Sequence, residues 1–568
     1  MPGKINRFHI LLLLVFLLAL VLRFWKLGLY PEAIDEDEMA FGYYGYSLVN
    51  FGTDEYGHKL PIYFESVGDY KYGLYSYLAA IPIKVFGLNN VTTRSISALA
   101  GSLSVILIFY LVKKLSGNPT FSIISALVLA LNPIHIHFSR VAYNNGLGAF
   151  FSMLAVYLFV VYVSDKRKRY LLYSFVSALL AFYTYQTYRI FLPAVIITYY
   201  LLNFKKFVKD SRINIFTTLL VSVALLSFIP AQSRARSTGM DILIDRPKLI
   251  EQYTEDGLSN VSMLSTRLLH NKYVSMSYGF INRYFSYFDP VFLFSQLSAQ
   301  TERHSVPNMG VFYFFESIFF VIGLICVRKV FKGNNYLLPL IFVVAAPIAA
   351  ATVVGDRSIT RSMILVWGMS IFISAGVYQL LKEWKRLYIV VAFLYIGGLF
   401  YFLHQYYIHK PLHQPWYGDV GLSEMVSYTS KHSLDYRYVV ISKGHYMPFI
   451  YYNKLSPDYL KNKAVFLNIK PDTGTKIQSI DNIIFNMPYD CPSAGKLNVL
   501  YACFGYRIPK NSKVVNLIRF RDNQPAVVLI EFGKTDGKLP ERLEYFDNDS
   551  RFTNGILPDS YPYFWPEK

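Results

Sequence analysis

The sequence predicts an α-helical polytopic membrane protein, with about 11 transmembrane helices, that ends in an α/β domain outside the membrane. The chain is 53% hydrophobic but only 16% charged, whereas soluble domains carry about 25% charged residues. Apolar stretches recur between residues 8 and 404, and short basic clusters follow every second one. Most of the net charge of +19 falls in those clusters, so we attribute it to membrane orientation and not to nucleic-acid binding.

The transmembrane helices are predicted from length, because a helix needs roughly 20 mostly apolar residues to cross a bilayer. The expected spans lie near residues 8–25, 95–112, 121–138, 147–163, 170–186, 190–204, 213–230, 311–327, 336–354, 362–380 and 387–404. The first run follows Lys4 and Arg7, as a signal peptide would. The segment Leu22-Arg23-Phe24-Trp25 offers no small-residue cleavage site, so we expect an uncleaved anchor.

The orientation of the chain follows from its basic loops, which mark the cytoplasmic side. These loops hold Lys4 and Arg7; Lys113 and Lys114; residues 166–169; Lys205, Lys206, Lys209 and Arg212; Arg328, Lys329 and Lys332; and Lys382, Lys385 and Arg386. All six clusters share one side if the spans are counted as above. The N-terminus is then cytoplasmic at the cell membrane, and loops 26–94 and 231–310 lie outside with the tail. The apolar segment 74–88 is short and holds Pro82, so we expect an interfacial helix there.

The tail has the composition of a folded α/β domain. Strand-like runs at 438–441, 482–485 and 526–530 are separated by turn residues. We therefore divide the chain into a transmembrane domain, 1–404, and an extracytoplasmic domain, 405–568. Cys491 and Cys503 lie twelve residues apart in this domain, and we predict a disulfide between them.

The first outer loop carries a dense run of acids, with Glu32 and Asp35-Glu36-Asp37-Glu38 inside seven positions. Crowded carboxylates repel one another, which leaves a proton acceptor in the cluster. A solvated acidic turn that caps the next helix explains the run equally well. Carboxylates also suit a divalent metal, but an acidic run alone does not establish a metal site.

Basic residues stand at several outer helix ends, against the usual preference for the inner side. Lys71, two residues after Asp69, would hold a lipid phosphate as a point charge or simply snorkel to the membrane surface. Each outer Arg alone is a helix-end anchor, but together they indicate an anionic ligand. The other candidate substrate-binding residues are Asp69, Arg140, Arg189, Arg303, His304 and Arg361. His135 and His137 are too few for a metal site.

Four segments of the first loop resemble a known family: residues 37–48, 52–57, 60–64 and 68–71. They are similar to the bacterial branch of the protein O-mannosyltransferase-like glycosyltransferases, GT-C enzymes that use polyprenyl-phosphate sugars and include the lipid A aminoarabinose transferases. The resemblance runs through most of residues 1–404. It implies that Asp37 is catalytic with Glu38 as its neighbour, and that Lys71 contacts the lipid phosphate. Asp35 opens a second Asp-Glu pair and is the alternative catalytic acid.

The expected function is a membrane glycosyltransferase. Nucleotide sugars stay in the cytoplasm, so a transferase with an outer site needs a polyprenyl-phosphate sugar as donor. The acceptor would be a hydroxyl on a protein, a glycan or a lipid, and the anomeric centre would invert. Membrane lipids are the other expected partner, and we expect no binding of nucleic acid. No cofactor is implied beyond the sugar donor. A divalent metal ion is compatible with this reaction but is not required for it. The alternatives are a transporter or lipid flippase, which would place charges at mid-membrane, and a sensor that uses the membrane part only as an anchor.

Overall fold

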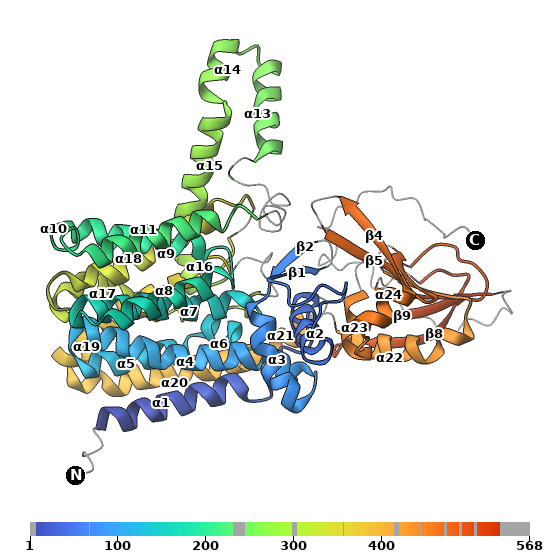
Figure 1. The fold of residues 1–568 in the computed structure, drawn as a ribbon, viewed down its shortest axis with the longest axis horizontal. Coiled ribbons are helices and arrows are strands. Elements are labelled where there is room, and N and C mark those ends of the chain that lie inside the picture. The colour runs from blue at the N-terminus through green and yellow to red at the C-terminus, as the bar shows by residue number, and fades with distance from the viewer. Residues whose placement is uncertain are drawn as a thin grey trace.

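The computed structural model describes residues 7–66, 69–230, 243, 245–297, 304–355, 357–413, 420–442, 446–470, 474–487, 491–504 and 508–533. Figure 1 shows a bundle of long helices lying side by side, a sheet domain at one end of the bundle, and a helical arm that projects from its side. The two-part fold class predicted from the sequence, helical membrane part and α/β tail, is confirmed.

Every apolar segment predicted to span the membrane contains a helix. In chain order these are α1 Arg7–Phe24, α4 Asn90–Ser116, α5 Pro119–Leu131 with α6 Pro133–Phe138, α7 Asn144–Asp165, α8 Lys168–Phe182, α9 Tyr188–Leu202, α11 Ser211–Leu226, α17 Glu316–Val330, α18 Leu337–Ala351, α19 Ile364–Glu383 and α20 Tyr388–His404. In the described part of the chain, six helical stretches are long and apolar enough to cross a membrane. The protein is therefore a multi-pass membrane protein, and the number eleven stays a prediction.

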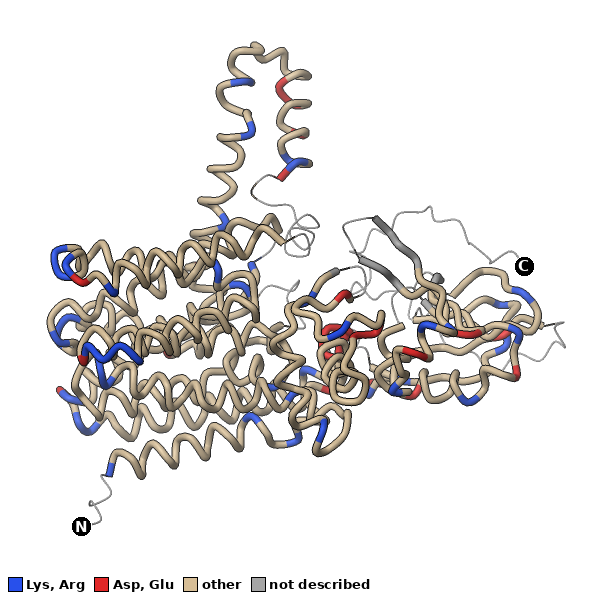
Figure 2. The backbone as a smooth tube through the Cα atoms, in the orientation of Figure 1, with Lys and Arg blue, Asp and Glu red and all other residues tan. Residues whose placement is uncertain are grey.

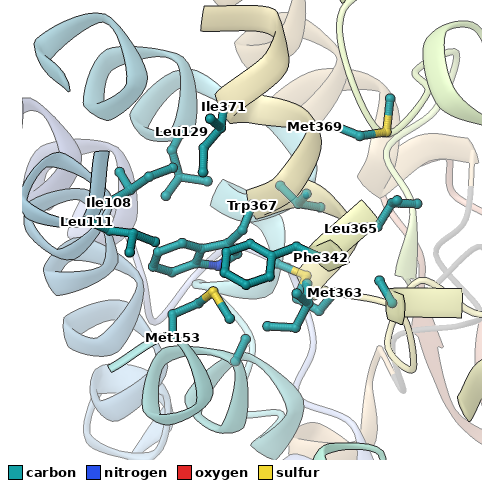
Figure 3. Packing of buried hydrophobic residues seen from close by; sticks show 14 of the residues in the cluster. Ile108, Leu111, Leu129, Met153, Phe342, Met363, Leu365, Trp367, Met369 and Ile371 are labelled. Atoms are coloured by element: carbon teal, nitrogen blue, oxygen red, sulfur yellow. The ribbon is translucent and has the colours of Figure 1, made fainter. Parts of the chain in front are cut away.

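The core of the bundle is built around α19. Trp367 on this helix is fully buried, and Figure 3 shows its indole among Leu111, Met153 and Phe342 from three other helices. A Cβ at Gly376 would clash with the carbonyl oxygen of Phe319 on α17. Small residues at such a crossing let two helix backbones approach closely, which is the main packing device within lipid.

The two ends of the bundle differ in charge. Figure 2 shows Lys and Arg residues gathered in the loops at the end that points away from the sheet domain. They include Lys114, which pairs with Asp165 at 2.7 Å, and Lys166, which pairs with Asp210 at 2.7 Å. We call the opposite end, beside the sheet domain, the domain end. That the domain end is extracytoplasmic stays a prediction based on the basic loops.

The first outer loop folds at the domain end. It contains α2 Glu36–Phe51, an antiparallel pair of strands β1 Tyr63–Ser66 and β2 Asp69–Tyr72, and α3 Leu74–Phe86. Phe64 of β1 pairs with Lys71 of β2. The predicted helix over 74–88 is present as α3, and it packs against α2 and α4.

The second outer loop is also helical, which the sequence reading did not specify. It contains α13 Arg246–Leu258, α14 Met263–Leu269, α15 Lys272–Ser286 and α16 Pro290–Phe294. A further short helix, α10 Phe204–Phe207, lies between α9 and α11. Helices α13, α14 and α15 form the arm that Figure 1 shows beside the bundle.

The tail forms one mixed seven-stranded sheet in the order β4-β5-β6-β3-β7-β9-β8. Its strands are β3 Tyr438–Ser442, β4 Ala464–Lys470, β5 Gly474–Ile480, β6 Ile483–Met487, β7 Val499–Cys503, β8 Ser512–Arg519 and β9 Pro525–Phe532, with helices α22 Leu422–His432, α23 Tyr446–Asn453 and α24 Pro457–Lys463. The predicted disulfide is confirmed, because Cys491 and Cys503 are bonded with Cα atoms 5.0 Å apart. The helical run from α20 continues through η4 Gln405–His409 and α21 Lys410–His413.

Candidate functional site

The acidic run of the first outer loop forms the start of α2. Asp35 is the N-cap, and its carboxylate accepts a hydrogen bond from the Glu38 amide at 2.9 Å. Asp35 also accepts a hydrogen bond from the Tyr143 hydroxyl and is buried. Acids in the first helical turn are stabilised by the helix dipole and by free amide groups. The interpretation of the run as a helix cap therefore holds for Asp35, whose side chain is occupied by these contacts.

Glu38 is buried in an ion pair instead of facing the solvent. Its two carboxylate oxygens accept hydrogen bonds from Arg94 Nε and Nη2, each at 2.8 Å. The amide of Ala142 donates a third hydrogen bond to Glu38 at 2.6 Å. With its oxygens held in this way, Glu38 is placed to fix the turn, and the catalytic role expected for it stays a prediction.

Asp37, also in this turn, stays partly accessible. Half of its side chain is exposed, and Lys71 Nζ donates a hydrogen bond to Asp37 Oδ1. Only 8% of the Lys71 side chain is exposed, so Lys71 does not extend along the membrane surface as a snorkelling lysine would. The structure thus brings Lys71 and Asp37 into direct contact.

Arg94 was missed by the sequence analysis, although it organises the site. It is fully buried, and besides Glu38 it donates hydrogen bonds to the carbonyl oxygens of Leu27 at 3.2 Å and Pro31 at 2.9 Å. One guanidinium thus ties the end of the first span, the acidic turn and α4 together. An arginine in the first turn of an apolar helix was the available signal, since such a charge needs a partner.

Two of the predicted ligand-binding arginines are buried in the fold. Arg140 donates to the carbonyl oxygens of Leu22 at 3.0 Å and Trp25 at 2.8 Å, which caps the end of α1. These contacts give Arg140 a structural role, and the expected ligand contact stays a prediction. Arg189 donates to the Ser227 carbonyl oxygen at 2.8 Å, and its guanidinium lies 4.6 Å from the ring centroid of Tyr72, the neighbour of Lys71.

The remaining predicted site residues are scattered around this centre. The His304 ring stacks on Phe138 with centroids 5.9 Å apart and meets the ring of Tyr143, the partner of Asp35. Arg361 is partly buried and acts electrostatically on Tyr287. Asp69 lies in β2, but its side chain and all of Arg303 lie outside the described residues.

The sequence analysis also missed an acid, Glu55. It is 1% exposed, and burial raises the pKa of the Glu55 carboxyl, with the neighbouring Asp54 raising it further. The side chains of Tyr44 and Tyr56 lie beside it. The Tyr56 ring in turn contacts Phe466 of β4, with centroids 5.5 Å apart. Glu55 therefore lies where the first outer loop meets the sheet domain.

The sheet domain holds α2 from the side opposite the bundle. The Tyr43 hydroxyl on α2 donates to the Leu455 carbonyl oxygen at 2.8 Å. The Tyr451 hydroxyl of α23 lies 3.1 Å from Thr93 Oγ1, next to Arg94. These contacts fix the helix that carries Asp37 between the two domains.

Metal ligands do not gather near this site. Within the described residues, no group of three or more His, Cys, Asp or Glu side chains could hold a metal ion. The charged groups that meet at the N-terminus of α2 are Asp37, Lys71, Glu38 and Arg94.

Comparison with known proteins identifies relatives of the membrane part. Residues 13–233 match the family described as Dolichyl-phosphate-mannose-protein mannosyltransferase. An uncharacterized protein of Aquifex aeolicus (strain VF5) is 26% identical over 190 residues. That match covers 34% of this chain and 37% of the relative.

Solved structures match a larger part of the chain. ArnT from Cupriavidus metallidurans, solved with bound undecaprenyl phosphate, matches with a TM-score of 0.53 at 10% identity, covering 92% of this chain and 97% of ArnT. The Archaeoglobus fulgidus oligosaccharyltransferase matches with a TM-score of 0.45 at 13% identity, covering 78% of this chain and 61% of that one. Residues 13–233 are thus similar to the protein mannosyltransferases, and the chain shares its fold with ArnT.

Proposed function

We propose that this protein transfers a sugar from a polyprenyl-phosphate donor to an acceptor hydroxyl at the domain end of the bundle, with inversion of the anomeric centre. The observation that carries the proposal is the pair formed by Asp37 and Lys71. It joins an accessible carboxylate to a mostly buried ammonium, at the end of the bundle where a lipid phosphate headgroup would lie. ArnT, whose fold this chain shares, was solved with undecaprenyl phosphate bound.

In the proposed reaction Asp37 is the general base. It accepts the proton of the acceptor hydroxyl as that oxygen attacks the anomeric carbon. The bond between the anomeric carbon and the phosphate oxygen breaks in the same step, and its electron pair leaves with the polyprenyl phosphate. A single displacement of this kind inverts the anomeric carbon.

Lys71 has two proposed tasks that follow one another. Its ammonium pairs with Asp37 in the structure, and an arriving phosphate would compete with that carboxylate for the same charge. When Lys71 moves to the phosphate, it stabilises the leaving group and releases Asp37 to accept a proton. Arg189, held against the ring of Tyr72, adds positive charge nearby.

Glu38, Arg94 and Asp35 are proposed to position the turn that carries Asp37. The buried Glu38–Arg94 pair and the Asp35 cap fix the backbone on both sides of Asp37. A base held in this way loses little freedom when the substrate binds, which favours the reactive geometry.

The activity is tested with the full-length protein reconstituted into lipid nanodiscs. Undecaprenyl-phosphate sugars that carry different hexoses or pentoses are offered with an envelope extract, and mass spectrometry follows both the release of undecaprenyl phosphate and the glycosylated product. The proposal predicts that at least one donor releases lipid phosphate together with an inverted product. Release from none of the donors, or transport of lipid without any transfer, would overturn it.

A further inference from the structure

In the described part of the chain, the helical arm projects from the side of the bundle and packs on it at its base. We call residues 246–286, which comprise α13, α14 and α15, the lateral arm. None of the residues in these three helices is buried. A helix gains most of its stability by burying an apolar face, so an arm with this much exposed apolar surface requires something to cover it.

The direction of the lateral arm indicates what covers its apolar surface. Figure 1 shows the arm running across the direction of the spanning helices, not along it. It leaves the bundle toward the domain end, away from the basic loops that Figure 2 shows at the other end. In a bilayer crossed by the bundle helices, the arm therefore extends along the membrane plane near one surface.

The base of the lateral arm rests on an apolar outer face of the bundle. The Tyr284 hydroxyl donates to the Val344 carbonyl oxygen at 2.9 Å, and Arg283 Nε donates to the Ala351 carbonyl oxygen at 2.8 Å. The Val344 side chain is 47% exposed on α18, which belongs to one of the stretches long enough to span a membrane. The apolar surface of the arm thus continues the surface that the bundle presents to lipid.

The sequence of α15 has the pattern of an interfacial helix. Val274, Tyr278, Ile281 and Phe285 follow one another at spacings of four, three and four residues, which places them on one face. All four are 43% to 64% exposed. Ser275, Gly279, Asn282 and Ser286 repeat the same spacing one position later and form a polar stripe.

The charge of the same segment suits an anionic lipid surface. Between Met263 and Ser286 the chain carries Arg267, Lys272 and Arg283 but no Asp or Glu. Leu264 and Leu268 of α14 add exposed apolar side chains at a spacing of four. Basic residues combined with an apolar helix face are typical of helices that lie in the headgroup region.

We propose that the lateral arm is an interfacial anchor that lies in the lipid headgroup layer at the domain end, with the Val274–Phe285 stripe toward the acyl chains. Its occupant is the bilayer itself, not a protein. This inference does not depend on the glycosyl-transfer reaction, because it uses residues outside the Asp37 site.

The test uses full-length protein in vesicles that contain anionic phosphatidylglycerol, in a Cys326→Ser background that leaves the Cys491–Cys503 disulfide intact. A bimane label is attached through Val274→Cys on the apolar stripe, and separately through Ser275→Cys on the polar stripe, which lies about 100° further around the same helix. Ile281→Cys serves as a second apolar-stripe variant. Quenching is measured with brominated acyl chains and with aqueous iodide.

The expected result is a difference between the two faces of α15. Brominated lipid should quench the Val274→Cys and Ile281→Cys labels at least about threefold more than the Ser275→Cys label, and iodide should show the reverse order. Equal access of iodide to all labels would overturn the anchor. Suppose instead that the Val274→Cys label is protected from iodide but is not quenched by brominated lipid, and that copies of the protein cross-link. That result would also overturn the anchor, in favour of a protein interface.

Discussion

Lys71 on β2 donates a hydrogen bond to Asp37 in the first turn of α2, across 34 residues of the first outer loop. The contact joins the lysine expected to hold a lipid phosphate with the acid expected to accept a proton. Phosphate binding and release of the base would therefore be coupled, because one ammonium serves both anions.

Lys71→Ala should weaken binding of a polyprenyl-phosphate donor and slow departure of the phosphate. Loss of a hydrogen bond to a charged group costs about 1.5–3 kcal/mol, which corresponds to roughly 10- to 150-fold in affinity. Lys71→Arg should retain part of the binding, since it keeps the charge but changes its shape. Donor affinity is measured by titration of undecaprenyl phosphate into protein in nanodiscs.

Lys84→Ala is the matched control for Lys71→Ala. Lys84 lies in the last turn of α3, in the same outer loop, and it is an exposed residue with no expected ligand contact. We expect its donor affinity to equal that of the wild type. If Lys71→Ala and Lys84→Ala bound the donor equally well, Lys71 would not hold the phosphate.

Arg94→Ala should destabilise the protein strongly, because it leaves Glu38 charged and buried without its partner. Breaking a buried ion pair in this way typically costs about 3–5 kcal/mol. Arg521→Ala is the comparison, since Arg521 pairs with Glu32 at 2.6 Å in an exposed position, where a pair contributes about 1 kcal/mol or less. The unfolding temperatures of both variants, measured by tryptophan fluorescence in nanodiscs, show which substitution destabilises the protein more. An Arg94→Ala protein as stable as Arg521→Ala would contradict the role given to the buried pair.

Glu55 predicts a pH dependence of the contact between the first loop and the sheet domain. Burial raises the pKa of the Glu55 carboxyl in the folded protein, so the folded state binds that proton more tightly than the unfolded chain. Its contribution to stability is complete below the unfolded pKa and falls as the pH rises above it. Glu55→Gln should remove this loss and raise the unfolding temperature at pH 8 more than at pH 5.

The control for Glu55→Gln is Glu424→Gln, at an exposed position on α22. It should change the unfolding temperature by the same small amount at both pH values. If the unfolding temperatures of the wild type and Glu55→Gln changed identically with pH, Glu55 would not be the source of the pH dependence.

Much of the fold was predictable because it depends on local sequence. Apolar length alone located the helices, and alternation with turn residues located several strands of the tail. The disulfide followed from two cysteines in a domain expected outside the cytoplasm, and the structure pairs them. The arm at 246–286 was not predicted, because its helices are short and too polar for a search based on membrane-length segments.

The site was less predictable because its contacts join distant parts of the chain. Asp37 and Lys71 were chosen from a family resemblance, whereas their direct contact depends on how β1 and β2 fold back toward α2. The pairing of Glu38 with Arg94 spans 56 residues, and no local pattern reveals it. Arg140 was expected near a ligand, and the sequence did not reveal that its Nη1 and Nη2 atoms bind carbonyl groups at the end of α1.

The most direct test of the account compares Asp37→Asn with Glu36→Gln, an acid in the same helical turn. Single-turnover transfer is measured in nanodiscs with the donor that the wild type uses. Removing a general base typically costs 10²- to 10⁴-fold, so transfer by Asp37→Asn should fall by about that factor while Glu36→Gln stays within a few-fold of the wild type. Folded, inserted Asp37→Asn protein that transfers sugar at a rate within a few-fold of the wild type would contradict the assignment of Asp37 as the base.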